Sequence, residues 1–113
     1  MDFGCAVREI APVELKKRLE AGEKIVIIDV REPRELEICK LANTAHIPLG
    51  SLPERIKELQ CYKEEEVVVY CLAGGRSQRA ADFLNASGFK SVYNLTGGIR
   101  AWADQVDPSI QKY

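Results

Sequence analysis

The sequence has few of the residues that mark metal-binding, membrane-spanning or disulfide-bonded proteins. Its 113 residues include four cysteines, one histidine, one tryptophan and one methionine. The cysteines, at positions 5, 39, 61 and 71, form no C-x-x-C pair, and no His/Cys spacing matches a zinc site. No window approaches the roughly 18 apolar residues that a membrane span needs. We therefore expect neither a metal site nor a transmembrane segment.

The numbers of basic and acidic residues are nearly equal. Sixteen Lys and Arg residues against 17 Asp and Glu residues give a formal net charge of −1, which argues against nucleic acid or anionic membranes as partners. The first eight residues lack the basic region and long apolar stretch of a secretion signal, so we predict a cytoplasmic protein. In that reducing compartment the cysteines are expected to be free thiols.

Apolar runs alternate with helical patterns along the chain. Strands are predicted at 8–10, 25–28, 45–48, 67–70 and 91–95, and the run Ile25–Ile28 is typical of a strand covered on both faces. Helices are expected between them, one beginning at Pro12 and one at a capping box formed by Ser51 and Glu54. The pattern predicts a three-layer α/β domain with a mainly parallel sheet over residues 1–103. Residues 104–113 form a tail expected on the surface or mobile.

One stretch of the sequence contains the candidate catalytic residue and the residues expected to surround it. Cys71 lies where the apolar strand 67–70 turns into a helical pattern, and it is followed by Leu72, Ala73, Gly74, Gly75, Arg76 and Ser77. A helix N-terminus favours a thiolate in front of it, and glycines with positive φ let successive amides turn toward an anion. Arg76 adds a permanent cation. These effects lower a thiol pKa from about 8.5 toward the range of roughly 3.5–7.5 of activated cysteines. The alternative is a buried strand-end thiol with no chemical role.

Several motifs in order resemble the rhodanese-type sulfurtransferases. They are Cys71-x-x-Gly74-x-Arg76-Ser77, Ile28-Asp29-Val30-Arg31-Glu32-Pro33-x-Glu35, His46-Ile47-Pro48-Leu49, and Asn94-Leu95-x-Gly97-Gly98-Ile99-x-Ala101-Trp102. The segments 38–49 and 107–113 further resemble the C-terminal rhodanese domains of adenylating enzymes in molybdopterin and thiamine synthesis. One departure is the turn at 39–44, where two glycines and a histidine of the family are missing and Asn43 is expected to take the left-handed conformation.

The resemblance implies a rhodanese-like domain with five strands in the order 3-2-4-5-1 or its mirror listing. It implies a thiosulfate sulfurtransferase-type enzyme without cofactor, in which Cys71 carries sulfur as a persulfide and the loop from Leu72 to Ser77 binds it. The resemblance further implies thiosulfate or a protein persulfide as the donor, and a thiophile or a sulfur-carrier protein as the acceptor. Asp29 and Arg31 are expected to form an ion pair first and to support the site second. His46 is a less favoured general base, because the family activates its thiol with backbone amides.

Two other functions stay open. Four residues separate Cys71 from Arg76, whereas related cysteine phosphatases and arsenate reductases have five, so the shorter loop favours sulfur over a tetrahedral phosphate. A non-catalytic interaction module is the second alternative. Cys5 or Cys39 is also a candidate to form a disulfide with Cys71 if the fold brings them together, whereas Cys61 has no expected role.

Overall fold

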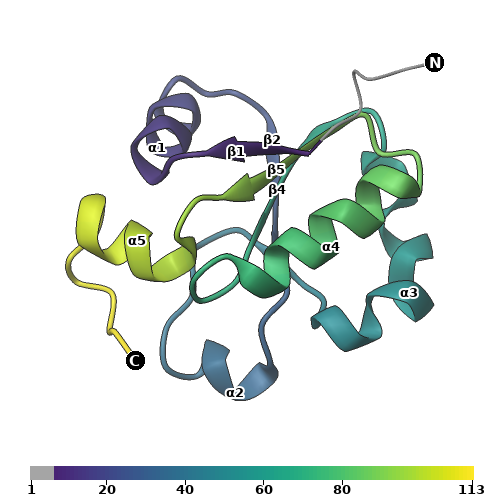
Figure 1. Cartoon of the computed structure of the whole chain (residues 1–113). Coiled ribbons are helices and arrows are strands. Elements are labelled where there is room, and N and C mark those ends of the chain that lie inside the picture. The colour runs from purple at the N-terminus through teal and green to yellow at the C-terminus, as the bar shows by residue number, and fades with distance from the viewer. Residues whose placement is uncertain (1–6) are drawn as a thin grey trace.

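A five-stranded sheet lies at the centre of the computed structural model, which describes residues 7–113 (Figure 1). Every pair of neighbouring strands is parallel, and the order β1-β5-β4-β2-β3 confirms the order that the family resemblance implies. The fold is therefore the predicted α/β arrangement. The strands are β1 (Arg8–Ile10), β2 (Ile25–Asp29), β3 (Ala45–His46), β4 (Glu66–Tyr70) and β5 (Ser91–Leu95).

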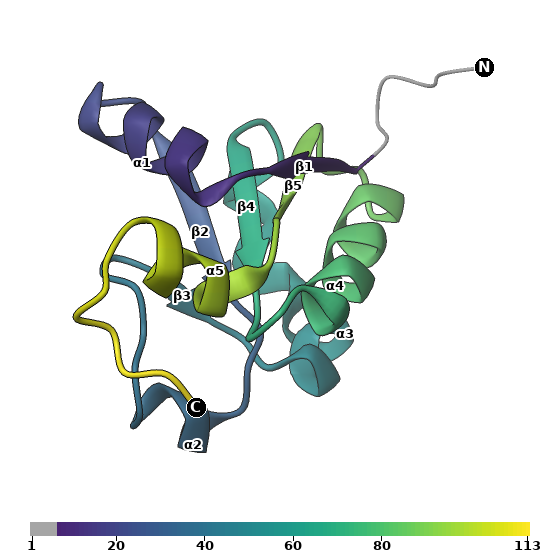
Figure 2. The same cartoon turned by 60° about the vertical axis from the view of Figure 1, so that its left-hand side comes forward.

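Helices cover both faces of the sheet. In two views, α1 and α5 lie on one side of it and α3 and α4 on the other (Figures 1 and 2). The short α2 lies beyond the carboxyl ends of the strands, at the same edge as the start of α4. The helices are α1 (Pro12–Glu20), α2 (Pro33–Leu36), α3 (Leu52–Arg55), α4 (Gly75–Ala86) and α5 (Gly98–Gln105), with 3-10 turns η1 (Leu49–Ser51) and η2 (Ile56–Tyr62).

The core has two parts because successive strand residues point to opposite faces. On β4, Val67 and Val69 pack with the side chains of α3 and α4, whereas Val68 and Tyr70 pack with those of α1 and α5. All four residues are fully buried. This double burial explains why the strand that leads to Cys71 is an uninterrupted apolar run.

Two local predictions have different outcomes. The capping box at Ser51 is wrong: Ser51 has φ −96° and ψ −8°, inside a continuous helical stretch, and its side chain makes no capping hydrogen bond. A capping residue needs extended backbone, which Glu32 has at the start of α2, where it forms a capping box with Glu35. Asn43 does take the left-handed conformation, with φ 58°.

Within residues 7–113 no helix is both long enough and apolar enough to cross a membrane.

Candidate active site

Cys71 lies directly after β4, at the base of a loop that leads into α4. Its side chain is buried, with 1% of its surface exposed. Gly74 has φ 117° and directs its amide to the sulfur, so that Gly74 N–H donates to Cys71 Sγ at 3.0 Å. Of the two glycines expected to take positive φ, only Gly74 does, because Gly75 is already the first residue of α4. A left-handed glycine thus turns the loop around the thiol.

Ser77 is the second donor to the sulfur. Its hydroxyl lies 3.4 Å from Cys71 Sγ and 2.5 Å from Asn94 Oδ1. Because a hydroxyl has one proton, Ser77 donates to either the sulfur or Asn94, and a thiolate draws that proton toward the sulfur. Burial by itself raises the pKa of the Cys71 thiol, but hydrogen bonds from the Ser77 hydroxyl and from the amides of Ser77, Gly74 and Ala73 outweigh it. The net effect is a pKa below the ordinary value, which favours the thiolate.

We expect Ser77→Ala to move the pH midpoint of Cys71 alkylation by iodoacetamide upward, because the variant loses a donor that stabilises the thiolate. The rate at neutral pH should fall accordingly, and mass spectrometry of the Cys71 peptide measures it. Ser87→Ala is the matched control, since that hydroxyl donates to the Phe83 main-chain oxygen at the far end of α4. An unchanged midpoint in Ser77→Ala would contradict the assignment.

Asn94 on β5 hydrogen-bonds to the loop around Cys71, a role that the sequence analysis did not predict. Its Nδ2 group lies 3.2 Å from the Gly74 carbonyl oxygen and 3.2 Å from Gln78 Oε1, while its Oδ1 faces Ser77. Asn94 is 4% exposed. Its place in the last resembling motif was the available signal, although the motif says nothing about which loop it contacts.

The start of α5 holds the other side of the loop. Ile99 N–H donates to the Cys71 carbonyl oxygen at 2.9 Å, and Arg100 N–H donates to that of Leu72 at 3.1 Å. Gly98 has φ 63°, and a Cβ there would overlap both carbonyl groups. Two loop carbonyls are thus held by α5, while the Gly74 amide donates to the sulfur and the amides of Ala73 and Ser77 help to lower the pKa of Cys71.

Arg76 pairs with a carboxylate instead of presenting a free cation to the thiol. Its Nη1 and Nη2 donate to Glu35 Oε1 and Oε2 at 2.6 and 2.9 Å. This charge-assisted hydrogen bonding with Arg76 holds the pKa of Glu35 at about 2, so the pair is ionised at neutral pH. The expected electrostatic help from Arg76 is therefore largely balanced by Glu35. Glu35 lay in a resembling motif, but only the fold brings α2 next to the loop.

Asp29 and Arg31 form the expected ion pair, completely buried. Arg31 Nη2 donates to Asp29 Oδ2 at 2.8 Å, and both side chains are 0% exposed. Arg31 also donates to the Cys39 main-chain oxygen at 2.8 Å and to the Tyr113 hydroxyl at 2.8 Å. The pair thus connects the end of β2 to the segment that follows α2. Neither residue hydrogen-bonds to Cys71 among the described contacts.

His46 and the other cysteines lie apart from the loop chemistry. His46 Nε2–H donates to the Arg31 main-chain oxygen at 2.6 Å rather than contacting Cys71. Cys39 packs in the cluster on the α1 and α5 face, whereas Cys71 packs in the opposite one. In the described part of the chain, Cys39, Cys61 and Cys71 are all free, and Cys5 lies outside the described residues.

No group of three or more His, Cys, Asp or Glu side chains in residues 7–113 is arranged to hold a metal ion. The chemical possibilities of the site rest on the thiol, the loop amides and the hydroxyl of Ser77.

Comparison with known proteins places this geometry in a family. Residues 11–105 match the family model of the rhodanese-like domain. Among solved structures, a rhodanese-related protein from Thermoplasma volcanium superimposes with a TM-score of 0.78 at 32% sequence identity, covering 88% of this chain and 93% of that one.

Curated relatives differ in length. A protein named sulfurtransferase from Allochromatium vinosum is 36% identical over 97 residues, which cover 86% of this chain and 89% of that protein. The chloroplastic rhodanese-like/PpiC domain-containing protein 12 of Arabidopsis thaliana is 40% identical over 95% of this chain, but the chain spans only 38% of it. The adenylyltransferase and sulfurtransferase MOCS3 of the same plant is 34% identical over 96% of this chain, which spans 26% of that protein. These matches agree with both resemblances noted in the sequence.

The fold, the loop around Cys71 and the family match over residues 11–105 together show that this chain belongs to the rhodanese-like domain family.

Proposed function

We propose that the protein is a sulfurtransferase in which Cys71 carries the transferred sulfur as a persulfide. The observation that carries the proposal is the environment of the Cys71 sulfur, a buried thiol that accepts hydrogen bonds from the Gly74 amide and the Ser77 hydroxyl. Relatives named sulfurtransferase support transfer of sulfur in general. The same amides that favour the thiolate also favour the negative terminal sulfur of a persulfide, as an oxyanion hole favours a developing charge.

The reaction is a double displacement. The Cys71 thiolate attacks the outer sulfur of the donor, the sulfur–sulfur bond of the donor breaks, and the bonding pair leaves with sulfite or with the donor thiolate. Cys71 then bears the terminal sulfur as an anion. An acceptor thiolate attacks that outer sulfur, and the bonding pair returns to Cys71 Sγ. No electrons are gained or lost overall, so the chemistry needs no redox cofactor.

The charges of the loop side chains influence which class of sulfur donor is favoured. Leu72 and Ala73 bring no charge, and Arg76 is paired with Glu35. A free dianion such as thiosulfate therefore receives modest electrostatic help, and a protein persulfide that contacts the exposed Ala73 and Gly75 is an equal candidate. The loop length argues against a phosphatase or arsenate reductase.

Partners follow from the chemistry. We propose a persulfide-bearing protein or thiosulfate as donor and a small sulfur-carrier protein as one acceptor. The relative named an adenylyltransferase and sulfurtransferase supports this choice. We also propose a cytoplasmic location, in which Cys71 stays reduced between turnovers.

Intact mass after incubation with a sulfur donor tests the proposal. Wild type is expected to gain one sulfur, about 32 Da, with thiosulfate or an alkyl persulfide, because the thiolate retains the outer sulfur as a persulfide. Cys71→Ser should gain nothing. Cys61→Ser is the matched control, because that thiol is exposed and lies in η2, before β4, and it should load like wild type.

Each other outcome has a definite meaning. Equal gain by wild type and Cys71→Ser would place the sulfur on another cysteine and refute the mechanism. No gain with thiosulfate but gain with the alkyl persulfide would leave protein persulfides as the donor class. Failure with both donors would favour the non-catalytic interaction module.

A further inference from the structure

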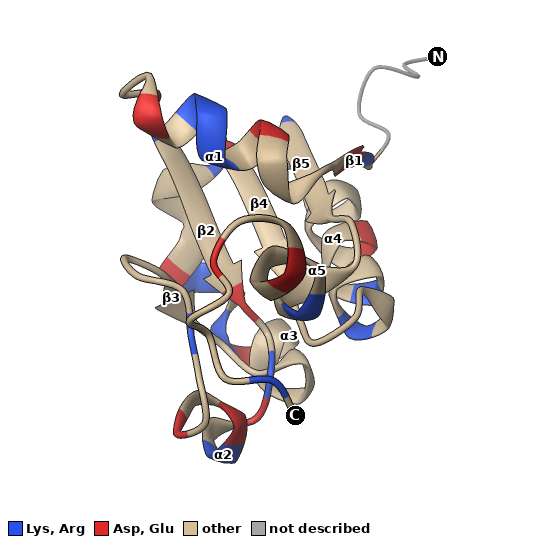
Figure 3. Ribbon diagram, turned by 90° about the vertical axis from the view of Figure 1, so that its left-hand side faces the viewer, with Lys and Arg blue, Asp and Glu red and all other residues tan. Residues whose placement is uncertain are grey.

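The segment after α5 turns back across the fold to reach α2. The amides of Val106 and Asp107 donate to the Trp102 carbonyl oxygen at 2.8 and 3.0 Å, which ends the helix. Asp107 Oδ1 then accepts from the Ser109 hydroxyl at 2.5 Å and closes a turn. Figures 1 and 2 both show the segment running from α5 toward α2, and Figure 3 shows that α2 carries both acidic and basic residues. The segment after α5 thus lies mostly at the surface, as expected, and it runs toward the candidate site.

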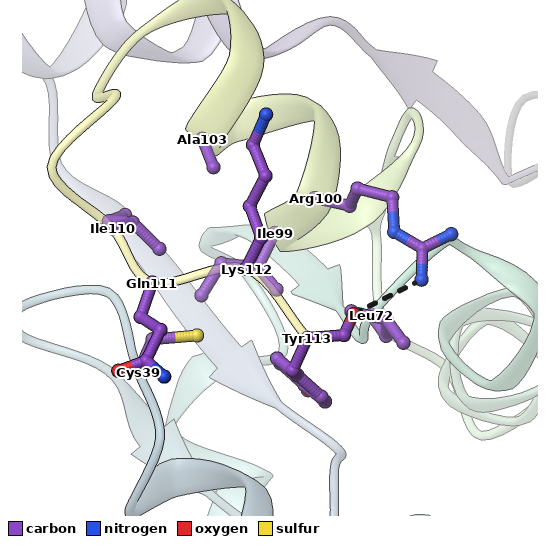
Figure 4. Close-up of a pocket in the computed structure, with 9 residues that line it drawn as sticks. All are labelled: Cys39, Leu72, Ile99, Arg100, Ala103, Ile110, Gln111, Lys112 and Tyr113. Carbon is purple, nitrogen blue, oxygen red and sulfur yellow. Dashed lines mark hydrogen bonds between the residues drawn. The ribbon is translucent and has the colours of Figure 1, made fainter.

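Two contacts fix the path of this segment. Ile110 packs against the buried apolar cluster on the α1 and α5 face of the sheet, as Leu72 and Trp102 also do. Arg100 Nη2 donates to the Tyr113 main-chain oxygen at 3.3 Å, and Leu72 and Tyr113 line one small cavity together (Figure 4). Segment 106–113 therefore lies against the loop residue that follows Cys71.

The Tyr113 hydroxyl has two partners at once. It donates its proton to Glu35 Oε2 at 2.7 Å and accepts from Arg31 Nη1 at 2.8 Å. Burial and the bond to Glu35 raise the pKa of Tyr113 to about 12, so the hydroxyl keeps its proton at neutral pH. The direction of donation is fixed, since Arg31 has only donors and an ionised Glu35 has only acceptors.

Glu35 connects Tyr113 to Arg76. Its carboxylate accepts four hydrogen bonds, from the Glu32 amide, from both Nη groups of Arg76 and from Tyr113. Arg76 is the second residue of α4, directly after the turn that encloses Cys71. The Glu35 carboxylate thus connects the Tyr113 hydroxyl to the Arg76 side chain.

We propose that Tyr113 is a positioning residue for sulfur loading: its hydroxyl orients Glu35, which holds Arg76 and with it the loop whose amides face Cys71. The inference rests on the proposed function and adds a residue outside the loop to it. Without the hydroxyl, Glu35 loses one of four donors and Arg31 loses an acceptor, so the Glu35–Arg76 pair samples other geometries. The loop then spends less time in the shape that stabilises the anionic sulfur.

The competing explanation is that Tyr113 only packs. Its ring lies over the Arg31 guanidinium, 5.9 Å from Cζ to the ring centroid. Tyr113→Phe separates the two roles, because it keeps the ring and removes the hydroxyl alone.

The test is a double-mutant cycle on the rate at which Cys71 gains sulfur, followed by intact mass at successive times. Tyr113→Phe should slow loading about three- to tenfold in the otherwise wild-type chain, the size of the effect of one ordinary hydrogen bond, because Tyr113 acts on the loop only through Glu35 and Arg76. In the Glu35→Ala and Arg76→Met backgrounds the same change should alter the rate less than about twofold, because neither the carboxylate at 35 nor the guanidinium at 76 remains to connect Tyr113 to the loop. Tyr62→Phe should match wild type, because Tyr62 is a half-buried tyrosine at the end of η2 whose hydroxyl makes no hydrogen bond within residues 7–113.

Two results would overturn the inference. One is a Tyr113→Phe rate equal to that of Tyr62→Phe. The other is an equal slowing of Tyr113→Phe in all three backgrounds, which would show an effect independent of Glu35. If wild type does not load sulfur at all, the proposed function fails instead, and the cycle is then measured on the pH midpoint of Cys71 alkylation. There the same non-additivity is expected if Tyr113 positions the loop.

Discussion

Arg31→Met is expected to lower the free energy of unfolding by about 3–5 kcal/mol, a large share of the roughly 5–15 kcal/mol available to a domain. Methionine has a similar length but leaves the Asp29 carboxylate buried without its cation. Both side chains of this pair are 0% exposed, so water cannot replace the lost partner. Urea unfolding followed by circular dichroism measures the loss.

The cost has more than one origin. Arg31 also donates to the Cys39 main-chain oxygen, and its guanidinium lies 5.5 Å from the centre of the Tyr70 ring. Asp29→Asn combined with Arg31→Met should therefore recover part of the stability, because no buried charge remains, but not all of it.

An exposed ion pair provides the matched control. Arg55 and Glu58 pair at 2.9 Å on the surface, with side chains 40% and 55% exposed. Arg55→Met should leave the urea midpoint unchanged, since such pairs are well solvated. If Arg31→Met has the same midpoint as Arg55→Met, the buried pair does not have the structural role assigned to it.

Gly98→Ala is expected to cost about 2–4 kcal/mol and to slow sulfur loading of Cys71 by ~10-fold or more. A Cβ at this position overlaps the carbonyl groups of Cys71 and Leu72, and the backbone has φ 63°. The start of α5 must therefore move away from the loop. Such a shift weakens the bonds from the Ile99 and Arg100 amides that hold the two carbonyls. Unfolding in urea and the time course of mass gain give the two measurements.

Two other glycines separate the causes. Gly22 also has positive φ, at 82°, but a Cβ there meets nothing within 4 Å, so Gly22→Ala reports backbone strain alone. Gly50 has neither positive φ nor a neighbour within 4 Å, and Gly50→Ala should resemble wild type. If Gly98→Ala costs no more than Gly22→Ala and loads sulfur normally, contact between α5 and the loop does not shape the site.

Much of the fold was predictable because local patterns and packing agree. The run Ile25–Ile28 predicted a strand covered on both faces, and in β2 Ile28 packs in the cluster on one face of the sheet and Ile27 in that on the other. The helix expected to begin at Pro12 is α1. The capping box at Ser51 failed because the motif records residue types, whereas capping depends on the backbone conformation of the preceding turn. The division of the chain at residue 103 stays a prediction.

The candidate site was predictable in part. The position of Cys71 at a strand-to-helix turn, the left-handed Gly74 and the Asp29–Arg31 pair all follow from short-range sequence, because the groups concerned are close along the chain. The partners of the loop were not. Glu35 is 41 residues from Arg76 and Asn94 is 17 from Ser77, so no local pattern specifies these contacts.

The sequence by itself determined the nucleophile candidate, the loop that encloses it and the alternation of strands and helices, since each depends on residue type and spacing over a few residues. The tertiary structure decided which charged side chains pair with one another. Parallel strands bring their carboxyl ends to one edge, and there α2, the loop, the start of α5 and segment 106–113 meet. Only this meeting pairs Arg76 with Glu35, sets the Gly98 backbone against the loop carbonyls and brings the Tyr113 hydroxyl between Arg31 and Glu35. Side-chain contacts between distant segments depend on that geometry, which residue spacing does not encode.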